Sequence, residues 1–318
     1  MLDRIVPLVS SRPWLVLTGA GMSTASGIPD YRDPDGTRRI QPMRIDEFRA
    51  SAEARRRYWA RSYVGWQNLR RARPNPAHLA LTSLQRAGVT GAVITQNVDG
   101  LHQSAGTGAV TELHGSLARV VCEACGEVSS RSALDARMAA ANPGFVGRGT
   151  QIRPDGDAVL SAMQVDGFRA PLCTRCSADR LRPDVVFFGD VVPRATVEHC
   201  FDLVERAEGL LVLGSSLQVM SGLRFVRRAA KRHLPIVVVT RGRTRADDLV
   251  TLKWEAPLQE ALPALAGRLI GDSAPTGDVR STGDVRATGD VRATGDERAT
   301  GTVRAAEDGR SARVSIGG

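Results

Sequence analysis

Short apolar runs recur along the chain and predict buried β-strands. These runs lie at residues 14–18, 89–95, 184–188, 209–213 and 235–240, and longer segments with helical spacing of apolar positions separate them. Two helices are expected at residues 43–72 and in "NPAHLALTSLQRAG", where Gly88 would form the C-terminal cap. This alternation predicts an α/β fold in which helices cover both faces of a parallel sheet.

The pattern changes between residues 121 and 180, which look like an inserted module. Two Cys-x-x-Cys pairs, Cys122/Cys125 and Cys173/Cys176, bracket an alanine-rich helix and a stretch punctuated by proline and glycine. Four thiolates at these spacings are typical of a closed, structural zinc site. A redox function for one pair is the alternative, but it would leave the second pair unused. The fifth cysteine, Cys200, has the helical surroundings of a buried, unreactive thiol.

From Thr276 onward, the chain repeats a six-residue unit such as "TGDVRA". Repeats this short, and rich in Gly, Thr and charge, predict a disordered tail rather than a solenoid. Residues 276–318 contain seven arginines and seven acidic residues. The whole net charge of +9 therefore belongs to the rest of the chain.

Composition narrows the class of protein. The 318 residues are 42% hydrophobic, which suffices for a globular core. No apolar run approaches the ~20 residues of a membrane span, and the first residues show no small-residue cleavage site. We therefore expect a cytoplasmic protein with no membrane partner. The net charge admits an anionic partner, although the arginine-rich stretch 49–73 is more typical of a solvated helix surface.

The first apolar run leads into Gly19-Ala20-Gly21, a turn that suits dinucleotide binding. Small residues there let the backbone approach a pyrophosphate, and the N-terminus of a following helix would add N–H donors. A dehydrogenase would have a third glycine where this chain has Thr24. The turn alone leaves open a dinucleotide site of another kind and a tight turn that binds nothing.

Polar groups follow at places where a ligand would bind. "SGIPDYRD" combines Asp30, Tyr31 and Arg32 in a loop that could close over a ligand. His114, followed by a glycine in "ELHGS", could accept a proton at neutral pH. The candidates in "TQNVDGLH", which follows a predicted strand, are Gln96, Asn97, Asp99 and His102.

Six motifs together resemble the sirtuins, the NAD-dependent protein-lysine deacylases. In order they are "GAGMSTASGIPDYR", "TQNVDGLH", the His114-Gly115 pair, the two cysteine pairs, "PDVVFFGD" and "GSSLQV". The resemblance covers about residues 12–265. It implies a Rossmann-like NAD domain at 1–120 and 181–270, a zinc module inserted at 121–180, and a tail at 271–318.

The resemblance also implies an activity in which NAD is consumed. In sirtuins the nicotinamide–ribose bond breaks as the acyl-lysine oxygen attacks the ribose, and the acyl group ends on ADP-ribose. Transfer of ADP-ribose to a protein, or removal of lipoyl groups, would use the same NAD site and remains an alternative. A non-catalytic zinc protein that binds nucleic acid would leave His114 and "TQNVDGLH" unexplained, so direct nucleic-acid binding is not expected.

Carried over residue by residue, the resemblance makes His114 the general base, with Asn97 and Asp99 also in the catalytic set. Residues 185–190, Val185 to Asp190, would pair with the acyl-lysine peptide as an extended strand. The implied cofactor contacts are Gly19, Ala20, Gly21, Asp30, Tyr31, Arg32, Gln96, Asn97, Asp99, Gly214, Ser215, Ser216, Thr240 and Leu258.

One departure from the family pattern and two features that resemble particular branches of the family stand out. Thr240 stands where an asparagine commonly binds the adenosine ribose, so that contact is expected to be weaker or altered. The long insert between the cysteine pairs resembles the class II branch. Tyr58 and Arg61 have the spacing by which another branch grips acidic acyl groups, but a packed helix face is the favoured interpretation.

Overall fold

The computed structural model describes residues 1–10, 13–31, 37, 41–145 and 157–271. The chain divides into two units, Met1–Gly277 and Asp278–Gly318, and the fold described below is that of the first. The tail predicted to be disordered lies, apart from Gly271, outside the described residues. Among the helices of the described residues, none has the length and apolar character needed to traverse a bilayer.

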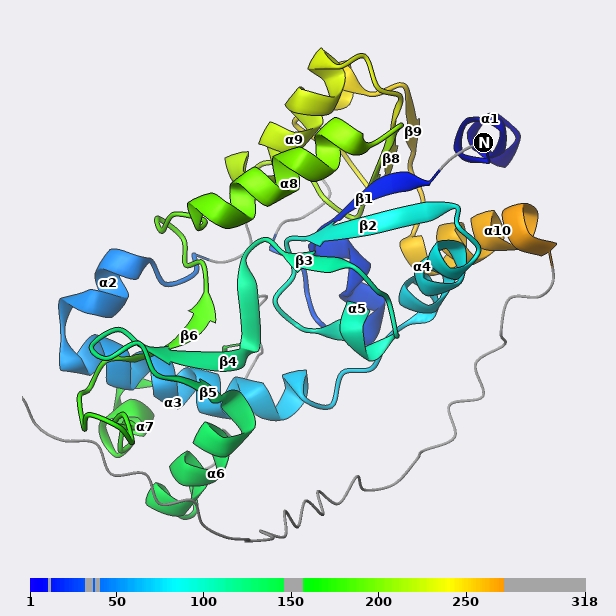
Figure 1. Ribbon diagram of the computed structural model, residues 1–318. Helices are drawn as coiled ribbons and strands as arrows, with labels where there is room; N and C mark the ends of the chain where they lie inside the picture. The colour runs from blue at the N-terminus through cyan, green and yellow to red at the C-terminus, as the bar shows by residue number, and fades with distance from the viewer. Residues whose placement is uncertain (11–12, 32–36, 38–40, 146–156, 272–318) are drawn as a thin grey trace, which may run out of the picture. The chain divides into compact units, whose positions relative to one another are not determined.

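A parallel sheet forms the centre of the first unit (Figure 1). Within the described residues it has six strands in the order β3-β2-β1-β7-β8-β9, and all neighbouring strands run parallel. Its strands are β1 (Trp14–Thr18), β2 (Thr90–Thr95), β3 (Val110–Glu112), β7 (Leu210–Leu213), β8 (Ile236–Val239) and β9 (Leu252–Trp254). Four of the apolar runs are thus confirmed as strands of one parallel sheet.

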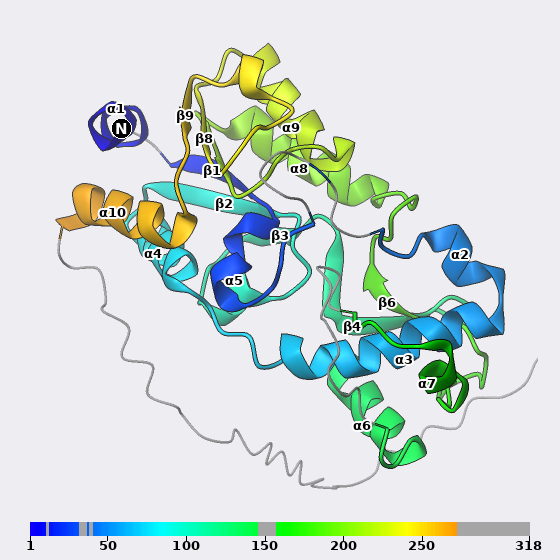
Figure 2. The same ribbon diagram turned by 180° about the vertical axis from the view of Figure 1, so that it is seen from behind.

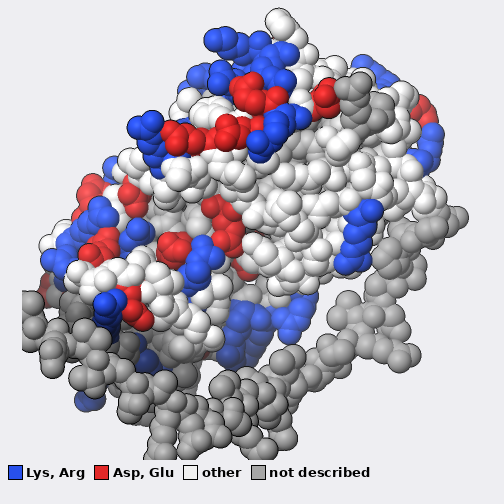
Figure 3. All heavy atoms as spheres, viewed as in Figure 1, with Lys and Arg blue, Asp and Glu red and all other residues white. Residues whose placement is uncertain are grey.

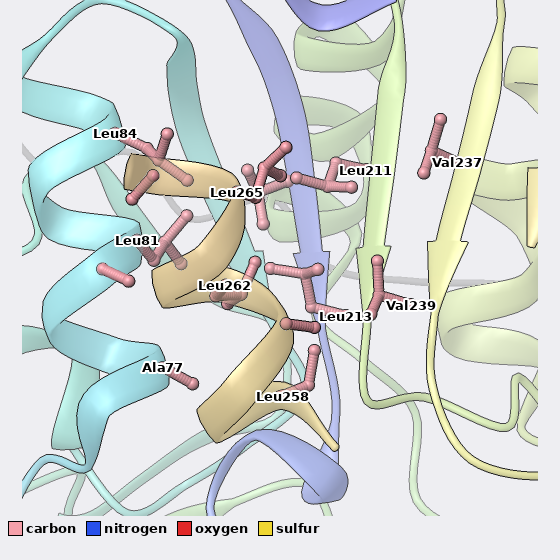
Figure 4. Close-up of a cluster of buried hydrophobic side chains, with 14 of the residues drawn as sticks. Ala77, Leu81, Leu84, Leu211, Leu213, Val237, Val239, Leu258, Leu262 and Leu265 are labelled. Carbon is pink, nitrogen blue, oxygen red and sulfur yellow. The ribbon is translucent and has the colours of Figure 1, made fainter. Parts of the chain in front are cut away.

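Helices cover both faces of this sheet, as predicted. One face carries α1 (Leu2–Val9), α4 (Pro76–Arg86) and α10 (Leu258–Ile270), and the other carries α8 (Arg194–Arg206) and α9 (Met220–Lys231). Successive residues of β7 pack on opposite faces of the sheet. Leu211 and Leu213 pack with α4 and α10 (Figure 4). Leu210 and Val212 pack with α8 and α9. Because both faces are covered, β7 and β8 are apolar throughout.

A separate hydrophobic core lies in the module that contains the four paired cysteines, called the cysteine module below. Figure 2 shows the strands and helices of this module. Its antiparallel sheet, in the order β5-β4-β6, consists of β5 (Val128–Ser130), β4 (Gly115–Cys122) and β6 (Leu181–Val185). The helices that contribute to this core are α2 (Ile45–Ala50), α3 (Ala52–Leu69), α6 (Arg131–Ala141) and α7 (Ala162–Asp166).

The prediction that residues 184–188 form a strand of the parallel sheet was wrong. Strand β6 ends at Val185 and pairs with β4 instead. Its buried residues alternate, with Leu181 and Pro183 inside, and this alternation is typical of an antiparallel strand with one solvated face. The apolar residues after Val185 leave the strand and run along a cavity.

The helix expected at residues 43–72 forms as α2 and α3, separated at Ser51. The Ser51 hydroxyl accepts a hydrogen bond from Ala54 N (3.1 Å) and so caps α3. Although both helices precede the cysteines in sequence, they pack in the core of the module, where Trp59 Nε1 donates to the Leu181 carbonyl (3.1 Å). The residue ranges proposed for the domains stay a prediction.

The arginine-rich stretch does not form a uniform positive face. Arg49 pairs with Glu123 (2.7 Å) and Arg55 with Asp179 (2.8 Å), both on the cysteine module. Figure 3 shows basic and acidic atoms interspersed on the face in view. Much of the positive charge at residues 49–57 is therefore compensated by neighbouring carboxylates.

Candidate active site

The carboxyl ends of the parallel strands line one cavity of about 770 Å³. Open α/β sheets bind their ligands at this edge. Arg32 lies outside the described residues. The other residues predicted for catalysis or cofactor binding all line the cavity: Gly19, Ala20, Gly21, Asp30, Tyr31, Gln96, Asn97, Asp99, His114, Gly214, Ser215, Ser216, Thr240 and Leu258.

The loops after β1 and β7 meet where the strand order reverses. A Cβ atom added to Gly19 would lie 2.8 Å from Ser215 Cβ, and one added to Gly21 would lie 2.9 Å from Gly214 Cα. Gly214 itself has a φ of +63°, which glycine adopts without strain. The glycines of both motifs are therefore needed for the two loops to approach each other.

The segment after this turn differs from the prediction. The sequence led us to expect a helix whose N-terminus faces the ligand. Within the described residues, the turn is followed by two 3₁₀ helices of three residues each, η1 (Ala20–Met22) and η2 (Thr24–Ser26). Gly27, with a φ of +84°, ends the second. The N–H groups of Gly21, Met22 and Ser23 donate to backbone carbonyls, and this segment lacks the dipole of a long helix.

Polar side chains after β2 tie three strand ends together. Gln96 Nε2 donates to Ser215 Oγ after β7 (2.8 Å). Asn97 Nδ2 donates to the Gly19 carbonyl after β1 (3.0 Å) and to Ser23 Oγ (3.1 Å). This network fixes the side chains of the "TQN" segment at the centre of the cavity.

Asp99 is held in the same network. Ser23 Oγ donates to Asp99 Oδ2 (2.7 Å), and the backbone N–H of Leu101, at the start of α5 (Leu101–Ser104), donates to Oδ1 (2.9 Å). Burial raises the pKa of this carboxyl, while the two hydrogen bonds oppose the change. Ser23 was not predicted as a site residue, because nothing in the sequence distinguishes it from the neighbouring Ser26.

His114 follows β3 and has a partner on each ring nitrogen. Nδ1 lies 2.9 Å from the Gln96 carbonyl, and Nε2 lies 2.8 Å from Ser221 Oγ. Because a carbonyl only accepts, we assign the proton to Nδ1, which leaves Nε2 as the acceptor. Burial lowers the pKa of His114, the Gln96 hydrogen bond opposes this, and the charge of Arg224 lowers it further. His114 can therefore accept a proton at neutral pH.

His102, the remaining candidate in "TQNVDGLH", is not among the described cavity residues. It is 1% exposed, and its Nε2 contacts Thr18 Oγ1 (2.9 Å). Its ring packs edge-on against His78, with ring centroids 5.1 Å apart. His102 thus supports the sheet edge from behind the cavity.

Residues 185–190 line the cavity directly after β6. The Val186 N–H donates to the His114 carbonyl (2.9 Å), and the Phe188 carbonyl accepts from Ile45 N (3.0 Å). Phe188 also contacts the Tyr31 ring, with centroids 5.7 Å apart. This extended segment therefore links the general-base candidate to the loop that carries Tyr31.

The structure separates the environments of Tyr58 and Arg61. Tyr58 lines the cavity but is only 5% exposed, and its ring packs against Phe48 (5.2 Å) and Phe187 (5.5 Å). Arg61 is not among the described residues that line the cavity. The pair therefore does not present itself jointly to a ligand, in agreement with the packed helix face that the sequence favoured.

The four paired cysteines come together in the module. Their sulfur atoms all lie within 4.8 Å of one another, and the distances Cys122–Cys176 and Cys125–Cys173 are both 3.7 Å. A tetrahedral zinc ion with bonds of ~2.3 Å would separate its sulfur ligands by roughly 3.8 Å, so this donor set fits zinc. Cys200 is fully buried elsewhere, and burial raises the pKa of its thiol to about 12.

Comparison with known proteins agrees with this arrangement. The model of the Sir2 family matches residues 19–221. "NAD-dependent protein deacetylase 1" of Streptomyces coelicolor is 53% identical over 264 residues, which are 82% of this chain and 88% of that protein. Human "NAD-dependent protein lipoamidase sirtuin-4, mitochondrial" is 45% identical over 268 residues, covering 83% and 84%.

A solved structure of Sir2 with a p53 peptide and NAD⁺ has the same fold. Its TM-score is 0.66 at 30% sequence identity, and the match covers 84% of this chain and 98% of that one. This chain thus combines the strand-end cavity, His114 and the cysteine cluster. A family model and relatives match it over most of its length. The protein belongs to the Sir2 family.

Proposed function

We propose that the protein is an NAD-dependent protein-lysine deacetylase that releases nicotinamide and transfers the acyl group to ADP-ribose. The observation that carries this proposal is His114, a neutral base in a cavity that Asn97 and Asp99 also line. Relatives named NAD-dependent protein deacetylase support it. Bound NAD would supply the nicotinamide–ribose bond that is broken and the ribose that receives the acyl oxygen.

We assign the parts of the cofactor to different residues of the cavity. The diphosphate would lie against residues 19–21 and 214–216 at the cavity, where Gly19, Gly21 and Gly214 add no side chain of their own. Gln96, Asn97 and Asp99 would hold the nicotinamide ribose and carboxamide. Thr240, which is 8% exposed, and Leu258 would contact the adenosine. Asp30, Tyr31 and Arg32 would add further contacts to the cofactor.

The acyl-lysine peptide would bind in extended form along residues 185–190. These residues follow β6 and continue past His114, so a peptide there would carry its acyl group toward the base. The four cysteines would hold one structural zinc ion, which has no open position for catalysis. A cytoplasmic location completes the proposal.

Nicotinamide release from NAD, measured with a panel of acyl-lysine peptides, tests this function. Acetyl, succinyl, lipoyl and long-chain peptides are compared for the native protein, for His114→Ala, and for His199→Ala, whose exposed histidine on α8 is outside the described cavity residues. We expect peptide-dependent release that falls about 10²- to 10⁴-fold in His114→Ala only.

The acyl panel also separates the alternatives. The name of human sirtuin-4 favours lipoyl-lysine as a second substrate to test. Release that occurs with no acyl peptide, accompanied by ADP-ribose on a protein acceptor, would replace deacylation by ADP-ribosyl transfer. Formation of acyl-ADP-ribose that His114→Ala leaves unchanged would remove His114 from the reaction.

A further inference from the structure

We propose that Ser221 is a second catalytic residue, which relays the proton of a substrate hydroxyl to His114. Ser221 would accept that proton at Oγ while its own proton passes to His114 Nε2. One substrate O–H bond and one Ser221 O–H bond break, and one Ser221 O–H bond and one Nε2–H bond form. The inference rests on the proposed function, in which His114 takes a proton from a ribose hydroxyl.

The number of acceptor sites on His114 is the first argument. Nδ1 carries its proton toward the Gln96 carbonyl (2.9 Å), so neutral His114 has a single lone pair, on Nε2. Ser221 Oγ lies 2.8 Å from that nitrogen, where its hydroxyl donates to the lone pair. A substrate hydroxyl therefore finds the base already occupied.

The Ser221 hydroxyl, which occupies the lone pair of His114 Nε2, can also pass a proton to that nitrogen. Its oxygen has two lone pairs and accepts a hydrogen bond while its proton is donated elsewhere. Ser221 lines the cavity and is 8% exposed, so its oxygen is within reach of a bound molecule. A proton can therefore reach Nε2 through Ser221 without any movement of the two side chains.

The position of Ser221 relative to His114 is fixed by close packing. Ser221 stands in the first turn of α9, and the next residue, Gly222, lies against the side chain of Gln96. A Cβ atom on Gly222 would lie 2.7 Å from Gln96 Oε1. Because the Gln96 carbonyl is also the Nδ1 partner, one residue links both sides of the imidazole.

Positive charge near the imidazole keeps His114 Nε2 unprotonated before the reaction. Arg224 follows Ser221 by three residues on α9 and lowers the pKa of His114, in addition to the effect of burial. The positive end of the α9 dipole points toward the same ring. On the other wall, Asp99 is bonded to Ser23 and to the Leu101 N–H and not to the histidine. The base therefore stays unprotonated until the relay delivers its proton.

Three serine variants test the relay in the full chain. Ser221→Ala removes the hydroxyl and Ser221→Thr keeps it. Ser132→Ala is the matched control, because Ser132 is an exposed serine at the second position of α6, as Ser221 is of α9. We expect Ser221→Ala to lower kcat for acyl transfer about 10²-fold with KM for NAD little changed. Ser221→Thr should recover most of the rate, and Ser132→Ala should match the native protein.

Two readouts distinguish a relay from a structural role. In H₂O–D₂O mixtures, the native rate of the His114-dependent step should curve with deuterium content because two protons move, and the Ser221→Ala rate should be linear. In the free protein, ¹⁵N NMR should show the His114 Nε2 resonance moving in Ser221→Ala while Nδ1 stays in place.

Each opposite result overturns the inference. A Ser221→Ala rate that is unchanged or increased would mean that the hydroxyl only blocks the base. An unmoved Nε2 resonance would mean that the hydrogen bond is absent in solution, and this measurement does not depend on activity. The Nε2 resonance could move in Ser221→Ala while the native protein shows no acyl transfer. That result would refute the proposed function and, with it, the relay.

Discussion

Two hydrogen bonds and one neighbouring charge define the chemistry available to His114. The Gln96 carbonyl selects the tautomer, Ser221 occupies the remaining nitrogen, and Arg224 disfavours a second positive charge nearby. The sequence indicated His114 through the glycine that follows it and through the family motif. Ser221 carries no comparable signal, because its role depends on a contact between residues 107 positions apart.

The pKa of His114 predicts the acid limit of activity. Burial and Arg224 lower it below the ordinary value of 6.5, so the base stays unprotonated until the pH falls below that value. The acidic limb of kcat/KM should therefore lie below pH 6.5, and Arg224→Gln should move it to higher pH. A pH profile of acyl transfer measures both. A native limb at or above 6.5 would contradict this electrostatic account.

At the scale of elements, the apolar runs predicted the central strands because buried parallel strands are apolar on both faces. Three-residue strands such as β3 and β9 are too short to produce such a run. The segment 184–188 was misassigned because its strand ends at Val185, after which Phe187 packs in the module's core and Phe188 contacts Tyr31. The helix expected after Gly21 is replaced by 3₁₀ turns, which have no distinct periodicity over three residues.

Arg131 joins α6 to α3 in the core of the module. Its guanidinium is fully buried between Trp59 and Trp66, 5.2 and 5.1 Å from the ring centroids, and donates to Ser62 Oγ (2.9 Å). Arg131→Ala should lower the free energy of unfolding by about 3 kcal/mol, since it opens a cavity and leaves a buried acceptor unpaired.

Urea unfolding of Arg131→Ala beside Arg227→Ala measures this cost. Arg227 is an exposed arginine on α9, and its loss should change stability by less than about 0.5 kcal/mol. Equal effects of the two substitutions would mean that the stacked guanidinium contributes nothing specific.

The cysteine cluster should determine whether the module stays folded. Cys122 and Cys173 are buried in the same core as Trp59 and Leu134. Removal of zinc by a chelator, or Cys125→Ser, should therefore loosen that core and lower the melting temperature, whereas Cys200→Ser should leave the zinc content unchanged. Zinc analysis and circular dichroism on the same samples measure this. Full zinc content in Cys125→Ser would contradict the four-thiolate site.

At the scale of the first unit, the sheet and the module contribute to one cavity. The nicotinamide end uses strand ends of the sheet, and residues 185–190 come from the end of the module's β6. Sequence reasoning located these segments because each follows a strand or carries a family motif. It did not indicate that α2 and α3 belong to the core of the module, since that depends on packing across long sequence separations.

Two buried histidines make the stability of the fold depend on pH. Burial lowers the pKa of His78 to about 3, with a contribution from His102, and lowers that of His102 to about 4. In the unfolded chain both imidazoles titrate near 6.5. Below that pH the unfolded state therefore binds protons that the two buried imidazoles of the folded state do not bind. Stability should therefore fall with decreasing pH, from about 6.5 toward 4.

Urea titrations at pH 7 and pH 5 measure this loss. Together, the two histidines should remove roughly 3 kcal/mol over that interval, and His102→Gln should reduce the difference by about half. The exposed His199 provides the control, since His199→Gln should leave the difference unchanged. Identical pH dependence in all three proteins would exclude His102 as a source of the effect.

The destination of the acyl group decides between lysine deacylation and ADP-ribosyl transfer. A peptide with a ¹³C-labelled acetyl-lysine is incubated with NAD and the native protein. All products are then identified and quantified by mass spectrometry. The account predicts the label on ADP-ribose, in one-to-one ratio with free nicotinamide. Label that stays on the peptide while nicotinamide is released, with ADP-ribose on a protein, would contradict it.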